Sequence, residues 1–275
     1  MLRRIDLTTG EQTVLSSHSA GVKSVVYSSD NDVVISASWD KTLHIHFPRD
    51  PAHSANTINL PEKPFSVSFS ATKLVVAMAA RLVHIYDLKA LSMLASQSSL
   101  DPPNILAMNP WQERESSLKF MTRAVACMPN DNGYASSSIE GRVAVEWFDP
   151  SEKSQARKYA FKCHRQVEDD TDIVFPVNAL AFHPVHGTFA SGGGDGVVAL
   201  WDAVAKRRIR QYARLPSSIA SLSFSAGGKY LAIGISPGFE DAEEVVGKGV
   251  VKVFIKEIGE EARAKGGKGE KADGE

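Results

Sequence analysis

VNALAFHPVHGTFASGGGDGVVALWDA, residues 177–203, contains three short apolar runs separated by two turns. VNALAF alternates so that successive side chains fall on opposite sides, TFAS forms the second run, and VVALW, closed by Trp201 and Asp202, forms the third. The glycines of GGGDG can adopt the positive φ that tight turns require, and Asp195 can hydrogen-bond the backbone of its own turn. Three strands with hairpin-length gaps predict an antiparallel meander.

The same pattern recurs along the chain. Four more alternating runs, VKSVVYS from Val22, FSVSFS from Phe65, TRAVACM from Thr122 and IASLSFS from Ile219, open segments that each end in a further apolar strand. The start-to-start steps between the five runs are 43, 57, 55 and 42 residues. The two shorter steps match the length of a WD-repeat propeller blade, the longer ones leave room for inserted loops, and a closing Trp-Asp pair is typical of such blades. The sequence therefore predicts an all-β WD-repeat β-propeller with five recognisable blades, at about residues 18–59, 60–94, 118–165, 176–213 and 217–257.

The segments outside these repeats have their own predicted roles. Residues 1–17 have the pattern of a blade end followed by an outer strand, so the predicted propeller domain covers residues 1–258. We expect the connection 95–118, which ends in ERESSLK, to be an exposed loop, and the connection 150–176 to hold an outer strand in KYAFKCHR and a solvated loop in VEDDTD. An insertion, SPGFEDAEEVVGKG, interrupts the fifth repeat. Alanine is the only apolar residue type in 259–275, so these residues are expected to form a disordered tail.

Composition limits the classes of partner. With 31 basic and 32 acidic residues the formal net charge is −1, so no global field favours nucleic acid or an acidic membrane surface. The two cysteines, Cys127 and Cys163, form no disulfide framework and no CxxC pair. No apolar run approaches the length of a membrane span, and no secretory leader or glycosylation sequon is found. We therefore expect a soluble intracellular protein with no direct nucleic-acid or membrane partner.

Motifs for catalysis and metal binding are missing from the sequence. It contains no phosphate-binding GxxxxGK[ST], no GxSxG nucleophile elbow and no HExxH. His44 and His46 alternate on one strand and His183 and His186 flank a turn, but two histidines without a third ligand make a poor metal site. Three of the four acids in VEDDTD could bind a cation, although a solvated loop is the simpler interpretation. The prediction is a protein that is not an enzyme, with no metal and no cofactor.

One rim of the predicted propeller has the composition of a binding surface. In a four-stranded meander, the turn between the second and third strands lies at the same end as the connection to the next blade. This rule places Trp39, Arg142 and Arg165 on one rim, and an exposed tryptophan near arginines is typical of a protein-interaction hot spot. The alternative is that Trp39 only covers its own loop. Beside the same turn, His18 and Asp40 are predicted to form a buried hydrogen-bonded pair.

A basic turn, Lys206-Arg207-Arg208, follows the Trp201-Asp202 pair on the opposite rim or on the outer side. Its simplest interpretation is a solvated turn, and contact between Arg207 and a phosphate group is the sharper alternative. Asp195, Trp201 and Asp202 are predicted to be structural residues of their blade.

Four segments together resemble one known family. They are RESSLK (114–119), SSIEGRVAVE (137–146), YAFKCHR (159–165) and PVNALAFHPVHGTFASGGGDG (176–196). They are similar to the spindle-assembly-checkpoint family of WD-repeat propellers and, less closely, to the related messenger-RNA export propellers. RESSLK and SSIEGRVAVE favour the checkpoint family.

The resemblance implies a non-catalytic, seven-bladed scaffold. It implies binding of a short motif in checkpoint kinases and kinase-like checkpoint proteins, at family positions that Trp39 and Arg165 match; rim geometry adds Arg142. It also implies binding of a phosphorylated kinetochore scaffold, near a basic position that Arg207 matches, and ubiquitin is a further candidate partner. The implied location is the nucleus, with the kinetochore in mitosis and some protein in the cytoplasm. The family's front blades have no counterpart here, which predicts an open arc of five blades. The alternative function is a nuclear-pore-associated messenger-RNA export propeller.

Overall fold

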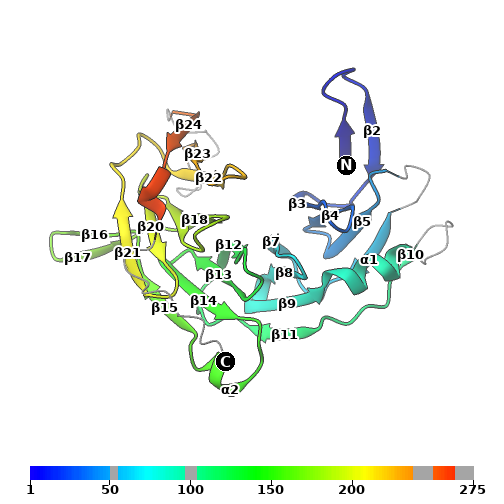
Figure 1. The fold of residues 1–275 in the computed structure, drawn as a ribbon, viewed down its shortest axis with the longest axis horizontal. Coiled ribbons are helices and arrows are strands. Elements are labelled where there is room, and N and C mark those ends of the chain that lie inside the picture. The colour runs from blue at the N-terminus through cyan, green and yellow to red at the C-terminus, as the bar shows by residue number, and fades with distance from the viewer. Residues whose placement is uncertain (50–54, 97–103, 238–249, 264–275) are drawn as a thin grey trace, which may run out of the picture. The chain divides into compact units, whose positions relative to one another are not determined.

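The computed structural model describes residues 1–49, 55–96, 104–237 and 250–263. The chain divides into two compact units, Met1–Val177 and Asn178–Glu275, and each is described by itself. The five predicted repeats are confirmed as five β-sheets, in which all strand pairs but one are antiparallel among the described residues (Figure 1). The open arc predicted from the sequence stays a prediction.

The first unit begins with a hairpin of β1 (Leu2–Ile5) and β2 (Gln12–Ser16), as predicted for residues 1–17. The first sheet contains β3 (Val22–Ser28), β4 (Val33–Ser38), β5 (Thr42–His46) and β6 (Asn56–Asn59), with the short β10 (Asn104–Ile105) parallel to β6. The second sheet contains β7 (Pro64–Phe69), β8 (Lys73–Met78), β9 (Leu82–Asp87) and β11 (Gln112–Glu115). The third contains β12 (Thr122–Cys127), β13 (Gly133–Ser138), β14 (Arg142–Trp147) and β15 (Tyr159–Lys162).

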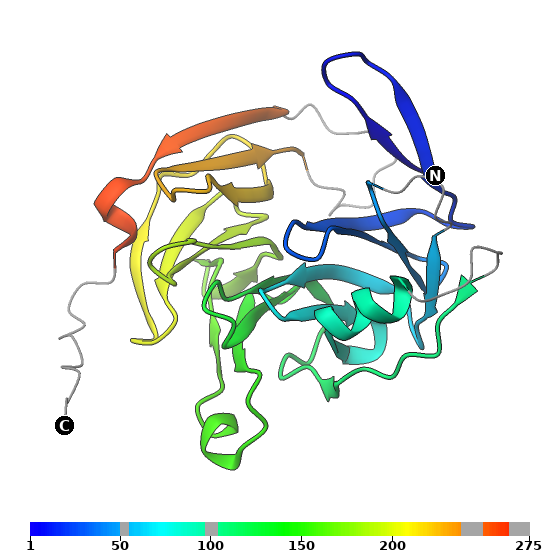
Figure 2. The same cartoon turned by 45° about the vertical axis from the view of Figure 1, so that its right-hand side comes forward.

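The second sheet is buried on both faces, which explains its continuous apolar run in β8. Leu74, Val76 and Met78 belong to a core shared with the first sheet and with helix α1 (Leu88–Ser96). Val75 and Ala77, which point the other way, belong to a core shared with the third sheet. A strand covered on both sides has no polar face to alternate with, so its sequence reads as KLVVAM. Figure 2 shows α1 beside the strands of this region.

Hydroxyl groups also connect the second and third sheets. Ser66 Oγ and Ser68 Oγ of β7 accept the backbone N–H groups of Val125 and Cys127 at 3.0 and 2.9 Å. These bonds satisfy donors on the first strand of the third sheet that its own sheet leaves unpaired, and they fix the register between the two blades.

The second unit contains the fourth and fifth sheets. The fourth is built from β18 (Val177–Phe182), which begins at the boundary, β19 (Phe189–Gly193), β20 (Val198–Asp202) and β21 (Arg207–Gln211). The fifth has three strands, β22 (Ile219–Phe224), β23 (Tyr230–Ile235) and β24 (Lys252–Glu257). Leu200, Ile219 and Ile233 are central to the core between them.

Three expectations about connecting segments need correction. The predicted loop 95–118 contains β11, because Gln112–Glu115 pairs with β9 and completes the second sheet. The predicted solvated loop VEDDTD is a hairpin of β16 (Arg165–Glu168) and β17 (Thr171–Val174), turned by Asp169 and Asp170 at positive φ. The predicted tail begins with an ordered 3-10 turn, Gly259–Ala262, whose Ala262 carbonyl accepts Thr188 Oγ1 at 2.7 Å. The remaining tail and most of the predicted insertion lie outside the described residues.

Candidate functional site

The predicted rim is a continuous line of turns in the first unit. Backbone hydrogen bonds of 2.8–3.1 Å join each turn between second and third strands to its neighbouring connection, and then to the next sheet. The bonds run from the N–H group of the first residue to the carbonyl of the second in the pairs Leu60–Lys41, Ala79–Lys63, Ser116–Arg81, Ile139–Met121 and Cys163–Gly141. The line therefore runs from the Trp39 turn of the first sheet to the base of β16, and we call it the rim.

Trp39 is half-exposed at the start of the rim. Its backbone N–H donates to the Gly21 carbonyl at 3.0 Å, and its ring lies beside Gly21. The ring covers part of its own loop, as the simpler interpretation proposed, and 48% of the residue stays open to solvent. Trp39 can therefore present an aromatic face without losing its support.

The predicted His18–Asp40 pair is present. His18 Nδ1 lies 3.0 Å from Asp40 Oδ2, and the same carboxylate accepts the N–H of Ser19 at 2.9 Å and the hydroxyl of Thr42 at 2.6 Å. Burial opposes ionisation of Asp40, but the bonds from Thr42 and Ser19 and the nearby His18 outweigh it and lower the pKa of this carboxyl to about 2. An ionised Asp40 thus pins the connection at Ser19 to the turn that carries Trp39.

Two further histidines pack behind this pair. The rings of His18 and His44 stack with centroids 3.7 Å apart, and Ser16 Oγ lies within hydrogen-bond distance of both His44 and His46. Burial, followed by the charges of neighbouring histidines, lowers the pKa of His44 and of His46 to about 4. Within the described ranges, no group of three or more potential ligands is arranged to hold a metal ion. Through His18, the cluster contacts Asp40 in the turn that carries Trp39.

The two predicted arginines meet at one residue, Glu140. Arg165 Nη2 donates to the Glu140 carbonyl at 2.8 Å, and Arg142 Nε lies 3.5 Å from the Glu140 carboxylate. Arg142 also pairs across the sheet with Lys162, so three cationic side chains gather at this end of the rim. In the described part of the chain, Nε of each arginine is buried without a hydrogen-bond partner. The arginines are thus held by the Glu140 backbone and by two carboxylates, since Asp172 Oδ2 also lies 3.9 Å from Arg165 Nη1.

The structure does not bring Trp39 against the arginines. Trp39 belongs to the first sheet, Arg142 and Arg165 belong to the third sheet and the hairpin after it, and the second sheet packs between the first and third. A ligand that used both ends would have to extend across three blades.

Sequence reasoning missed three apolar residues of the rim. Phe120, Met121 and Ile139 are exposed at 52, 43 and 39% in the stretch between Trp39 and the arginines. Ile139 occupies the position in SSIEG that Trp39 occupies in SASWD, so aligning the repeats could have identified it. Nothing local in the sequence marks Phe120 and Met121, because their exposure depends on how the preceding segment is held.

That segment is held by a buried ionic network. Glu146 on β14 is 2% exposed; it accepts the hydroxyl of Ser117 at 2.9 Å and that of Tyr134 at 3.1 Å, and Arg114 lies 3.9 Å away. Arg114 also donates to the carbonyls of Trp147 and Phe148. The RESSLK and SSIEGRVAVE segments therefore meet in space, and their contact fixes the path of the chain into Phe120.

Arg207 lies in the second unit, so its placement relative to the rim is not assigned. It is the exposed first residue of β21 and pairs across the sheet with Asp202. The residues predicted to be structural in this blade form local hydrogen bonds: Asp202 accepts the N–H groups of Val204 and Ala205, Asp195 accepts that of Val197, and Trp201 Nε1 donates to Ser191 at 2.8 Å.

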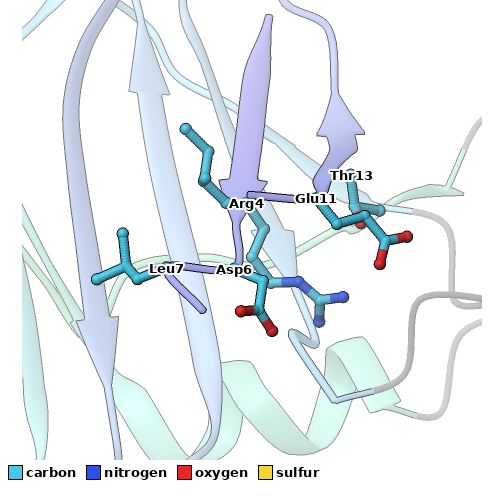
Figure 3. Close-up of a pocket in the computed structure, with 6 residues that line it drawn as sticks. Arg4, Asp6, Leu7, Glu11 and Thr13 are labelled. Atoms are coloured by element: carbon cyan, nitrogen blue, oxygen red, sulfur yellow. The ribbon is translucent and has the colours of Figure 1, made fainter. Parts of the chain in front are cut away.

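The β1–β2 hairpin carries a shallow pocket of about 420 Å³ (Figure 3). Asp6 in its wall accepts the N–H groups of Thr8 and Thr9, and these bonds hold the pKa of Asp6 below its usual value. Arg4 Nη1 donates to the Pro48 carbonyl at 2.5 Å. Asp6 is engaged in holding the hairpin turn and Arg4 in a bond to the segment after β5, so the pocket suggests no chemistry of its own. Among the described residues, no helix has the length and apolarity required to cross a membrane.

Comparison with known proteins identifies the repeats and the family. The family model "WD domain, G-beta repeat" matches residues 10–46 and 159–202. A solved β-propeller domain, Cps50 (Swd1) of Myceliophteria thermophila, superimposes with a TM-score of 0.60 over 86% of this chain and 73% of its own, at 14% identity, which shows the propeller fold alone.

Curated relatives are much closer in sequence. The chain is 47% identical to mitotic checkpoint protein BUB3.1 of Arabidopsis thaliana, over 88% of this chain and 68% of that protein. It is 38% identical to spindle assembly checkpoint protein bub3 of Schizosaccharomyces pombe, over 83% of this chain and 66% of that protein. The mRNA export factor GLE2 of Chaetomium thermophilum is 31% identical over 84 and 60%. The predicted resemblance is confirmed: the chain belongs to the BUB3 family of mitotic checkpoint WD-repeat propellers.

Proposed function

We propose that this chain is a non-catalytic scaffold of the spindle assembly checkpoint that binds a peptide segment of a checkpoint kinase or kinase-like checkpoint protein along the rim. Membership of a family of checkpoint proteins supports the checkpoint role, which would place the protein in the nucleus and at the kinetochore in mitosis. The observation that supports this location of the binding site is the structure of the rim. Its linked turns present exposed apolar side chains and end at paired guanidinium groups.

The chemistry of the rim defines the peptide. Trp39, Phe120 and Ile139 offer apolar contact, and aromatic anchors supply much of the energy of such interfaces. Arg142 and Arg165 can clamp a carboxylate in bidentate fashion, because a guanidinium presents its donors as a planar fork. The expected ligand is therefore an acidic, partly helical segment with apolar residues along one face.

Calorimetry on alanine variants of the full chain tests this proposal. The probes are overlapping 20-residue peptides that tile a checkpoint kinase outside its catalytic domain. Trp39→Ala and Arg165→Ala should each weaken the tightest peptide by about thirtyfold, as expected when a hot-spot contact worth about 2 kcal/mol is removed. Trp111→Ala and Arg157→Ala are matched controls, because both residues are exposed and lie away from the rim. Equal losses in all four variants, or none in the first two, would reject the rim as the site.

A second proposed partner is a phosphothreonine motif of the kinetochore scaffold, bound near Arg207. The export function is the alternative, and the lower identity to GLE2 makes it the weaker one. Phosphate dependence separates the two, since only the checkpoint scaffold requires the phosphorylated form of its ligand. A phosphorylated and an unphosphorylated version of the same kinetochore peptide therefore form the decisive pair of probes.

A further inference from the structure

The hairpin of β16 and β17 presents an open apolar face beside the rim. Cross-strand partners are Arg165 with Val174 and Val167 with Asp172, so these four side chains lie on one face of the two-stranded ribbon. Val167 is 69% exposed and Val174 is 37% exposed. Figure 1 shows the hairpin as a ribbon that projects from the end of β15. The exposure of Val167 on this ribbon calls for an explanation other than packing in a core.

The base of this face is fastened to the rim. Arg165 Nη2 bonds the Glu140 carbonyl, and the Val174 side chain lies over Gly141, 3.1 Å from the position that a Cβ there would take. The Phe175 N–H closes the hairpin on the His164 carbonyl at 3.0 Å. The face with Val167 therefore continues the surface that ends at Arg165, without a break in the chain of contacts.

The charged residues of the hairpin determine which charges a segment bound on it should carry. Residues 165–174 carry four carboxylates and a single guanidinium. The guanidinium is at the base, next to the rim. Asp172 lies one pair farther out, opposite Val167; it is 3.9 Å from Arg165 Nη1 but its side chain is 63% exposed, and the turn adds Asp169 and Asp170. A segment passing outward from the rim thus meets a cation first, then an apolar surface, then anions.

We infer that this face, which we call the hairpin face, is a second docking surface for the same peptide that occupies the rim. Its occupant carries an apolar residue followed by a lysine or arginine, placed after the acidic residue that Arg165 holds. The apolar side chain packs on Val167 and Val174, and the cation pairs with Asp172. This inference rests on the proposed rim function, because the peptide reaches the hairpin only if it first engages Arg165.

Matched substitutions on the two faces of the hairpin test the inference. Val167→Thr keeps the shape and the strand preference but adds a hydroxyl, and Asp172→Asn removes one charge. On the opposite face, Thr171→Ser and Glu168→Gln are the corresponding controls, since both residues are exposed. With the tightest kinase peptide as probe and fluorescence polarisation as readout, each hairpin-face variant should weaken binding threefold or more. The controls should stay within twofold. Thermal melting followed by circular dichroism verifies that all four variants fold.

A double-mutant cycle identifies the contact itself. The basic residue of the peptide is replaced by glutamine, and the affinities of both peptides are measured for the wild-type protein and for Asp172→Asn. If the two residues form an ion pair, replacing the basic residue should weaken binding to the wild-type protein but not to Asp172→Asn. Tighter binding by Asp172→Asn would overturn the inference, since it would mean that Asp172 only competes for Arg165, from which it lies 3.9 Å. If peptide affinity falls on substitution of Trp39 and Arg165 but not of Val167 and Asp172, the hairpin face is rejected as a docking surface while the rim is retained. If substitution of Trp39 and Arg165 leaves peptide affinity unchanged, or if no peptide binds, both the proposed function and the hairpin face are rejected.

Discussion

The guanidinium of Arg165 donates from Nη2 to the backbone carbonyl of Glu140 at 2.8 Å, so its position depends on a turn 25 residues earlier in the chain. The same residue places its carboxylate 3.5 Å from Arg142 Nε. Glu140 therefore does two separate things: its backbone orients Arg165, and its side chain competes with any acidic ligand for Arg142. Separating these effects is straightforward, because substitution of the side chain leaves the carbonyl in place.

Glu140→Gln should strengthen binding of an acidic kinase peptide roughly two- to fivefold, because a partly exposed ion pair of this kind is worth less than about 1 kcal/mol and its loss frees Arg142. Fluorescence polarisation at low and at physiological salt is the measurement, and the gain should shrink as salt rises. Glu257→Gln, which removes an exposed partner of Lys229 in the second unit instead, is the control. Weaker binding by Glu140→Gln would show that the carboxylate itself contacts the ligand.

Acid should destabilise the first unit through its buried histidines. The pKa of His46 is about 4 in the folded state against 6.5 unfolded, because burial disfavours its charged form. Below pH 6.5, His46 therefore binds a proton in the unfolded chain but stays neutral in the folded chain until the pH approaches 4. The free energy of unfolding should fall from pH 6.5 to about 4, and this group should add no further loss below that.

His46→Gln tests this pH dependence. Urea unfolding at pH 7 and at pH 4.5 should show a smaller difference between the two pH values in the variant, by on the order of 2 kcal/mol. An undiminished difference would assign the acid sensitivity to other groups. His44, whose pKa is lowered to a similar value, provides a second variant for the same comparison.

Gly141→Ala should destabilise the protein much more than Gly187→Ala. Both glycines have positive φ, at 63° and 65°, so both substitutions incur the left-handed backbone penalty of about 1–2 kcal/mol. Only Gly141 is crowded: its added Cβ would lie 2.6 Å from the Cys163 carbonyl oxygen, whereas nothing lies within 4 Å at Gly187. Thermal melting should show a clearly lower midpoint for Gly141→Ala, and peptide affinity should fall with it because the turn positions Arg165. Similar midpoints for the two variants would contradict the packing described for this turn.

Arg207→Glu should abolish binding of a phosphothreonine peptide and leave kinase-peptide affinity nearly intact. A charge-assisted bond from guanidinium to phosphate contributes roughly 1.5–3 kcal/mol, and reversal of the charge adds repulsion. Titration of both peptides against the same variant is the measurement, with Trp39→Ala as the reciprocal control. Parallel loss of both peptides in Arg207→Glu would indicate damage to the fourth blade rather than loss of a phosphate contact.

The sequence by itself determined the repeat architecture and the local pairs. Alternation with a period of two and turn residues with fixed chemistry act over a few positions, so the inner strands of every blade, the Asp195 and Asp202 turns and the His18–Asp40 pair could be predicted. RESSLK and SSIEGRVAVE also pointed to the correct family. Which residues belong together at the rim could be stated only as a rule of topology.

Tertiary structure alone decided how the polar connections are used. β11 and the β16–β17 hairpin have few apolar residues, and a strand without an apolar period becomes recognisable only when its backbone pairs with a partner. The exposure of Phe120 depends on Arg114, Ser117 and Glu146 meeting in a buried network. Such contacts join residues about thirty positions apart, and their energy comes from burial of charge against its partner. No local pattern records that energy, because it arises only once the sheets are packed.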